Sequence, residues 1–286
     1  MPAGCVSKNR HILQMGNFMN NPIQKKIVII TGASSGIGAA TAHRLAKDGV
    51  CLVLAARRLD RLKQVAEDAQ NRGAEVLVVQ TDVRNREDLQ HLVDATLDRW
   101  GRIDVLLNNA GMGTDSAFVK MPSEEIRNEI AINLTAVIEC AQVVLPVMLR
   151  QKSGHIINVA SLAGMVAVPG AVVYSATKFG VNGFSDALHR ELLGTGIRVS
   201  AFCPGYTPSE ISPELKAIAE GQPDAPKVPG LMPVSYVADQ IARLIDRPRL
   251  RLVIPVGWRP LPLIAFIFPV FADKLMSYFS SKEYGE

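Results

Sequence analysis

The sequence predicts an α/β fold: one doubly wound, seven-stranded parallel sheet with helices on both faces. Three observations predict it. Seven short apolar runs recur along the chain, stretches of helical period separate them, and most of those stretches stop at a glycine. The runs are nearly continuous in apolar residues, which is typical of strands buried on both faces of a parallel sheet. They cover residues 27–30, 51–55, 76–79, 105–107, 156–159, 199–202 and 252–256.

The helical stretches follow the strands in alternation, as right-handed crossovers require. Residues 39–47, 61–71, 87–100 and 174–193 each run up to a glycine, at Gly49, Gly73, Gly101 and Gly194. Residues 122–150 form a longer stretch that opens with Pro-Ser-Glu-Glu, a helix-start signal.

Composition restricts the class of protein. The chain has 286 residues, 48% of them apolar and 20% charged, which are globular values and exclude a disordered chain, a coiled coil or a fibre. The net charge is +4 and the basic residues are scattered, so we expect no nucleic-acid partner. The four cysteines (Cys5, Cys51, Cys140 and Cys203) form no CxxC pair, which favours buried free thiols and a cytoplasmic location.

Three segments are predicted around this pattern. Residues 1–24 are polar and irregular, without the apolar core of a secretory signal, so we expect a flexible tail in which Met15 and Met19 are alternative starts. Residues 25–256, which contain the alternating pattern, are expected to form one domain, and 257–286 are an apolar C-terminal extension. Within the domain, residues 205–233 form a long proline-containing loop that is expected to bind substrate. No window of 18 apolar residues occurs, so we expect no spanning helix.

A glycine-rich loop follows the first strand directly. It reads Thr31-Gly32-Ala33-Ser34-Ser35-Gly36-Ile37-Gly38, and a helix comes next. Glycines at these positions allow a tight turn and a close approach to a pyrophosphate, which then lies at the helix N-terminus. The loop does not end in Lys-Ser or Lys-Thr, which disfavours a nucleoside-triphosphate site.

The end of the second strand predicts which dinucleotide binds. An NAD site would place Asp or Glu there, whereas this strand ends with Ala55-Ala56-Arg57-Arg58. Guanidinium groups suit a 2′-phosphate, and one could stack on the adenine. The sequence therefore predicts NADP (NADPH), with Ser34 as a further donor. Alternatively, the two arginines lie in solvent at the start of the next helix and bind no phosphate.

Tyr174 and Lys178 are four residues apart in a predicted helix, so they share one face. A neighbouring ammonium stabilises a phenolate and lowers the pKa of the phenol from its ordinary value near 10. An isolated pair of this kind is common by chance. Here, however, Ser161 follows the fifth strand, at the sheet edge where ligands bind.

Five motifs occur in order: Thr31-Gly-x-x-x-Gly-x-Gly38, Asn108-Asn109-Ala110-Gly111, Ser161, Tyr174-x-x-x-Lys178 and Pro204-Gly205. Over residues 25–256 the chain resembles the classical short-chain dehydrogenases/reductases, and the Arg pair resembles their NADP-preferring members. The resemblance implies a one-domain Rossmann fold that transfers hydride between a nicotinamide and a carbonyl or alcohol. It also implies a homodimer or homotetramer, formed through the helices at 122–150 and 174–193.

The resemblance also implies roles for single residues. Tyr174 is expected to be the general acid/base, Lys178 to lower its pKa and bind the nicotinamide ribose, and Ser161 to hydrogen-bond the substrate. Asn133 matches the fourth catalytic residue, which holds a water that links Lys178 to solvent. The expected cofactor-binding set is Gly32, Ser34, Ser35, Gly36, Ile37, Gly38, Arg57, Arg58, Asp82, Val83, Asn109, Ala110, Gly111, Tyr174, Lys178, Pro204, Gly205 and Thr207. Ala136 and Ser209 depart from the Gly and Thr that many members have there.

The substrate is expected to be a small carbonyl or alcohol of apolar character, because residues 162–173 are rich in apolar side chains. Core packing would explain the same composition. No metal is expected, because none of the five histidines pairs with a cysteine at ligand spacing. Alternative functions are a catalytically idle NADP-binding regulator, a membrane-docked protein, and a dehydratase or epimerase on the same fold.

The aromatic-rich segment 258–279 allows three interpretations. It caps the substrate pocket or a subunit interface, it lies on a membrane surface, or it is a loose tail. Within it, residues 273–279 are predicted to form an amphipathic helix.

Overall fold

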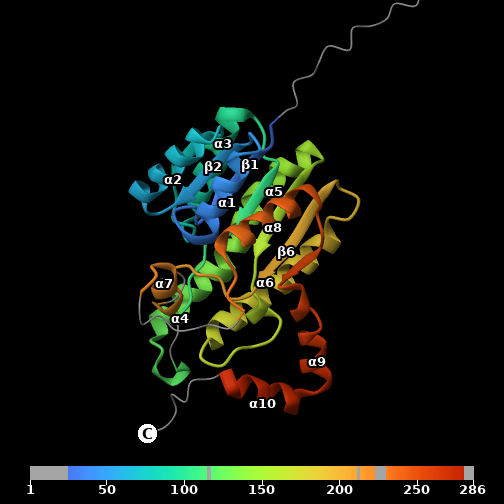
Figure 1. Ribbon diagram of the computed structural model, residues 1–286. Helices are drawn as coiled ribbons and strands as arrows, with labels where there is room; N and C mark the ends of the chain where they lie inside the picture. The colour runs from blue at the N-terminus through green and yellow to red at the C-terminus, as the bar shows by residue number, and fades with distance from the viewer. Residues whose placement is uncertain (1–24, 115–116, 211–212, 223–229, 280–286) are drawn as a thin grey trace, which may run out of the picture.

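The computed structural model describes residues 25–114, 117–210, 213–222 and 230–279 (Figure 1). The predicted tail 1–24, Cys5, and part of the predicted substrate loop lie outside these ranges. Seven parallel strands form one sheet in the order β3-β2-β1-β4-β5-β6-β7, which confirms the predicted fold class. The strands are β1 (Ile27–Thr31), β2 (Cys51–Ala56), β3 (Glu75–Gln80), β4 (Val105–Asn108), β5 (Gly154–Val159), β6 (Ile197–Pro204) and β7 (Arg251–Ile254).

Helices cover both faces of the sheet (Figure 1). One face packs against α1 (Gly36–Ala46), α2 (Leu59–Asn71) and α8 (Val234–Asp246), and the other against α3 (Arg86–Trp100), α5 (Ala136–Gln151) and α6 (Val172–Glu191). In β1, Val28 and Ile30 lie in the first core, whereas Ile27 and Ile29 lie in the second. Since alternate residues of a strand face opposite sides, each strand serves both cores, and this requires its continuous apolar run.

The strand order reverses at β1. Ile30 pairs with Leu54 of β2 on one side and with Leu107 of β4 on the other. The connections from β1 and β4 therefore leave the sheet in opposite directions, which opens a crevice at the carboxyl ends of these two strands. The glycine-rich loop and the Asn109–Gly111 segment both begin at this crevice.

Several boundaries differ from the prediction. β7 ends at Ile254 rather than at 256, because Pro255 has no backbone N–H to continue the ladder. The predicted helix 122–150 consists of α4 (Ser123–Ile130), a π-helical turn (Ala131–Thr135) and α5. The predicted loop contains a short helix, α7 (Pro213–Ala219). The prediction did not include α8, although its buried residues Val237, Ala238, Ile241, Ala242, Leu244 and Ile245 have helical spacing.

The C-terminal segment leaves the sheet beyond β7, through a turn at Val256–Trp258, α9 (Leu261–Ile267) and α10 (Pro269–Phe279). α10 begins four residues before the predicted helix start. Figure 1 shows both helices extending beyond the sheet, at the end of the molecule where α4 and α7 lie. Large apolar side chains at 263, 266–268, 270 and 271 are exposed, and Phe266 is 84% exposed.

By length and mean hydropathy, one helical run in the described ranges, Ser123–Gln151, is long and apolar enough to cross a membrane. Half of its most apolar window is buried inside the fold, as in a core helix of a globular protein. Cys51, Cys140 and Cys203 are buried free thiols, as predicted. Burial raises the pKa of Cys140 and Cys203 to about 12, so both stay protonated at neutral pH.

Candidate active site

The glycine-rich loop connects β1 to α1 with little room for side chains. A Cβ at Gly38 would lie 2.4 Å from the Gly32 carbonyl oxygen, and a Cβ at Gly32 would lie 2.8 Å from the Ala110 Cα. Gly32 also has a φ of +65°, which disfavours any other residue. Ser35 caps α1 without a side-chain hydrogen bond, so the first turn can offer its N–H groups to an anion. The loop therefore fits a dinucleotide pyrophosphate.

Thr31 holds the two loops of the crevice together. Its Oγ1 accepts hydrogen bonds from the backbone N–H groups of Asn109 (3.0 Å) and Ala110 (3.1 Å). In return, the Asn109 Nδ2 donates to the Thr31 carbonyl at 3.0 Å. Sequence reasoning gave Thr31 no role, although its position at the end of β1 could have indicated one.

The predicted adenine contact at Asp82 is engaged within the chain. Its carboxylate accepts hydrogen bonds from the Arg84 guanidinium, at 2.5 Å from Nη2, and from the Arg84 backbone N–H at 3.1 Å. The hydrogen bonds from Arg84 hold the pKa of Asp82 below its usual value. Neighbouring Val83 is buried. The carboxylate is therefore charged, and its position is fixed beside β3.

The two predicted arginines behave differently. Arg58 Nη2 donates to the Ser35 Oγ at 2.8 Å and to the Ser34 Oγ at 3.2 Å, so these three side chains converge. Arg57 is exposed and is not part of this cluster; its carbonyl accepts a hydrogen bond from Gln80.

A carboxylate that the sequence did not predict completes the cluster. Arg58 Nη1 donates to the Glu210 Oε2 at 2.5 Å, and Arg61 Nη1 donates to the Glu210 Oε1. Glu210 follows β6, far from Arg58 in the sequence, and no local pattern indicates the contact.

The proton-transfer pair lies on α6. Lys178 is buried, and its Nζ donates to the Val159 carbonyl at 2.9 Å, at the end of β5. The same Nζ lies 5.5 Å from the centroid of the Tyr174 ring. Burial lowers the pKa of Lys178 to about 8. Ser161 comes two residues after Val159, and its Oγ accepts a hydrogen bond from the Ala163 N–H at 3.1 Å. The end of β5 and the first turns of α6 thus hold the predicted catalytic side chains in one region.

Asn133 lies in the π-helical turn, a distortion that is frequent at functional sites. Its Oδ1 accepts from the Met112 N–H at 2.9 Å, and its Nδ2 donates to the Met112 carbonyl at 2.7 Å. A Cβ at Gly111 would lie 3.3 Å from the Asn133 Oδ1 and 3.8 Å from the Lys178 Nζ. Gly111, Asn133 and Lys178 therefore lie close together beneath the crevice. The role of Asn133 in holding a water stays a prediction.

The segment after β6 covers the glycine-rich loop. Thr207 is buried and donates to the Gly205 carbonyl at 3.1 Å. A Cβ at Gly36 would lie 3.2 Å from the Ser209 Cβ, so Ser209 lies directly over the loop. Residues 204–210 therefore reach from the predicted nicotinamide end to the Arg58 cluster.

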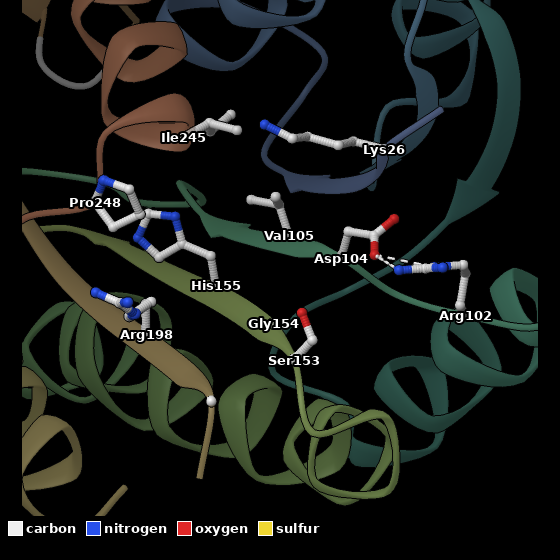
Figure 2. A pocket seen from close by; sticks show the side chains of 11 residues that line it. Lys26, Arg102, Asp104, Val105, Ser153, Gly154, His155, Arg198, Ile245 and Pro248 are labelled. Atoms are coloured by element: carbon white, nitrogen blue, oxygen red, sulfur yellow. Dashed lines mark hydrogen bonds and ion pairs between the residues drawn. The ribbon is translucent and has the colours of Figure 1, made fainter. Parts of the chain in front are cut away.

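A cavity of about 440 Å³ lies at the opposite edge of the sheet (Figure 2). Its lining includes Lys26 before β1, His155 at the start of β5 and Arg198 at the start of β6. Because the strands are parallel, their amino ends share this edge, away from the glycine-rich loop. The cavity is therefore not part of the candidate active site.

Comparison with known proteins decides the family. The family model described as short chain dehydrogenase matches residues 26–219. The chain belongs to this family. This short-chain dehydrogenase is therefore an oxidoreductase that acts on CH–OH groups with NAD or NADP.

Its similarity to individual proteins is extensive. A 3-oxoacyl-[acyl-carrier-protein] reductase of Synechocystis sp. is 40% identical over 193 residues, which cover 67% of this chain and 78% of that protein. The structure of an actinorhodin polyketide ketoreductase with NADPH is 32% identical with a TM-score of 0.73, over 82% of this short-chain dehydrogenase and 97% of that chain. A Burkholderia phymatum family member in complex with NAD is 27% identical with a TM-score of 0.77, over 86% and 95% of the two chains.

Proposed function

We propose that the protein is an NADP(H)-dependent oxidoreductase that interconverts a carbonyl and a secondary alcohol on an apolar substrate. The observation that carries this proposal is the position of the Lys178 ammonium, which the Val159 carbonyl fixes beside the Tyr174 ring. A buried cation one helical turn from a phenol favours the phenolate, and this makes the phenol an effective acid/base near neutral pH.

The preference for NADP rests on Arg58. With Ser34 and Ser35 it forms a cluster of one cation and two hydroxyls at the end of β2, where an NAD site would place a carboxylate. The glycine-rich loop between β1 and α1 would hold the pyrophosphate at the helix N-terminus, so the cluster lies where the adenosine ribose is expected. The NADPH in the actinorhodin ketoreductase structure supports the same preference.

The chain's own residues perform the proton transfer. When bound, NADPH would supply the hydride for the carbonyl carbon. The Tyr174 hydroxyl gives its proton to the carbonyl oxygen, and Ser161 hydrogen-bonds the same oxygen. In the opposite direction, the Tyr174 phenolate takes the proton of the alcohol. Lys178 keeps the phenolate low in energy and would hold the ribose of the nicotinamide through a hydrogen bond.

An apolar substrate is supported by the segment after Ser161. Leu162, Met165 and Val168 are half-buried there, and the Leu162 Cδ1 would lie 3.1 Å from a Cβ at Gly205, at the predicted nicotinamide end. Two of the similar proteins, a 3-oxoacyl-[acyl-carrier-protein] reductase and a polyketide ketoreductase, also favour a ketone on a carbon chain.

The test is a substrate screen that follows the absorbance of the reduced cofactor. Purified protein is mixed with NADPH or with NADH and with a panel of aliphatic ketones, 3-oxoacyl thioesters and sugars. We expect NADPH consumption with apolar ketones and little with sugars. Tight NADPH binding without turnover on any carbonyl would instead favour the catalytically idle regulator, although the retained Ser161, Tyr174 and Lys178 argue against it.

We propose further that the protein is cytoplasmic and that α9 and α10 rest on a membrane surface. The exposed aromatic side chains of Phe266, Phe268 and Phe271 would enter the lipid, and the exposed basic residue Arg259 would meet anionic headgroups. Flotation with vesicles of anionic or neutral lipid tests this. Recovery with anionic vesicles, lost when the three phenylalanines are changed to serine, is the expected result.

A homodimer or homotetramer is proposed from the exposed apolar side chains of Ile130, Ile138 and Phe179, on the stretch from α4 to α6. Light scattering after size-exclusion chromatography tests this assembly. If the phenylalanine-to-serine variant becomes monomeric instead of losing vesicle binding, then α9 and α10 form a subunit interface.

A further inference from the structure

The candidate 2′-phosphate site holds a carboxylate of the protein itself. Arg58 donates with one nitrogen to the Glu210 Oε2 at 2.5 Å and with another to the Ser35 Oγ at 2.8 Å. Arg61 donates to the second oxygen of the Glu210 carboxylate. Glu210 therefore bridges two guanidinium groups, as a phosphate would.

The bridge is an interaction of charged groups. Burial acts to raise the pKa of Glu210, but the hydrogen bonds from Arg58 and Arg61 hold it below its usual value, so the carboxylate is ionised at neutral pH. A phosphate on the same arginines would bring a second anion against this carboxylate. Since like charges at hydrogen-bonding distance repel strongly, both cannot occupy the site together.

We propose that Glu210 competes with the 2′-phosphate of NADPH for Arg58 and Arg61, so that NADPH must displace Glu210 to bind. The inference rests on the proposed NADP preference and adds a residue that tunes it. NADH carries a hydroxyl in place of the 2′-phosphate and can bind with the bridge intact.

The displacement has a consequence for the substrate loop. Glu210 follows Ser209, which lies over Gly36, and Thr207, which lies at the predicted nicotinamide end. Release of Glu210 therefore removes one of the contacts that hold this segment against the glycine-rich loop and α2.

The experiment measures dissociation constants for NADPH, NADH, 2′,5′-ADP and 5′-AMP with the full chain and with Glu210→Gln. Glutamine keeps the size of the side chain and removes its charge. We expect NADPH and 2′,5′-ADP to bind about three- to tenfold more tightly to the variant, the range for loss of a partly exposed ion-pair network, and NADH and 5′-AMP to bind as before. Glu220→Gln is the matched control, because it removes the same charge from the same loop at a site paired with Lys216. It should leave all four constants unchanged.

A thermodynamic cycle checks the mechanism. In an Arg58→Ala/Arg61→Ala background, Glu210→Gln should no longer change the binding of 2′,5′-ADP. The inference is overturned if Glu210→Gln leaves the ratio of 2′,5′-ADP to 5′-AMP affinity unchanged or weakens NADPH binding.

The same dissociation constants also test the proposed NADP preference, independently of the role of Glu210. A wild-type protein that prefers 2′,5′-ADP, with no change in the variant, would contradict only the role of Glu210. A wild-type protein without that preference, which gains it in Glu210→Gln, would contradict the proposed NADP preference and support the competition.

Discussion

The Lys178 ammonium lies 5.5 Å from the centroid of the Tyr174 ring, and a hydrogen bond of 2.9 Å to the Val159 carbonyl fixes it there. The helix brings the two residues to one face, but the hydrogen bond to Val159 at the end of β5 fixes the position of the Lys178 ammonium. The sheet thereby places a buried cation beside the phenol, at the edge where the glycine-rich loop also begins.

Tyr174→Phe removes the hydroxyl and keeps the ring. We expect turnover to fall by about 10²- to 10⁴-fold, the usual contribution of a general acid/base, while NADPH binding stays within about twofold. Single-turnover kinetics and a fluorescence titration measure the two quantities. Tyr236→Phe, at an exposed position on α8, is the control and should be fully active. Near-normal turnover in Tyr174→Phe would show that another group transfers the proton.

Lys178→Met should make the cofactor-free protein more stable at pH 7 and nearly inactive. Burial lowers the pKa of Lys178 to about 8 from 10.5, so the charged native lysine is unfavourable below pH 8. Between pH 8 and pH 10.5, Lys178 binds more protons in the unfolded chain than in the native state. The free energy of unfolding therefore rises with pH in this range. The expected gain is on the order of 1–3 kcal/mol at pH 7 and smaller at pH 10.

Urea unfolding at the two pH values measures the gain from Lys178→Met. The exposed residue Lys63 on α2 provides the control, Lys63→Met, which should change the free energy of unfolding little at either pH. A loss of stability in Lys178→Met at pH 7 would contradict the cost assigned to the buried charge.

His155 should make the protein sensitive to acid. Burial, with Arg198 and Lys26 nearby, lowers the pKa of His155 to about 4 from 6.5. Between these values the unfolded chain takes up a proton that the native state does not, so stability falls as the pH drops from 6.5 towards 4. The loss between pH 6.5 and 5 should be about 2 kcal/mol. His155→Gln should flatten this part of the profile in thermal denaturation, whereas His91→Gln at an exposed site should not.

Gly38→Ala should damage the glycine-rich loop. The new Cβ would lie 2.4 Å from the Gly32 carbonyl oxygen, and this backbone atom cannot move without opening the turn. We expect a destabilisation of about 1–3 kcal/mol and weaker binding of NADPH. Gly183→Ala is the comparison, because a Cβ there meets nothing within 4 Å on α6 and should stabilise the helix by about 0.5–1 kcal/mol. Calorimetry and cofactor titration measure both variants.

The fold and most of the candidate site follow from short-range patterns. Continuous apolar runs predict buried strands, and the spacing of Tyr174 and Lys178 predicts a shared helix face, because both depend on the geometry of a single element. The glycine-rich loop and Ser161 follow strands directly, so their place at the carboxyl edge was predictable as well. Membership in the family confirms the fold and the class of reaction.

Other features arise where segments far apart in the sequence meet. The helical stretch 122–150 gave no sign of the π-helical turn at Asn133, whose side chain bonds the Met112 backbone beyond β4. Glu210 meets Arg58 across 152 residues, in a loop without a periodic pattern. The sequence alone determined the elements and their motifs, because their causes are local. Only the tertiary structure decided that Glu210 meets Arg58 and Arg61, because that contact depends on how the loop after β6 folds back over β2.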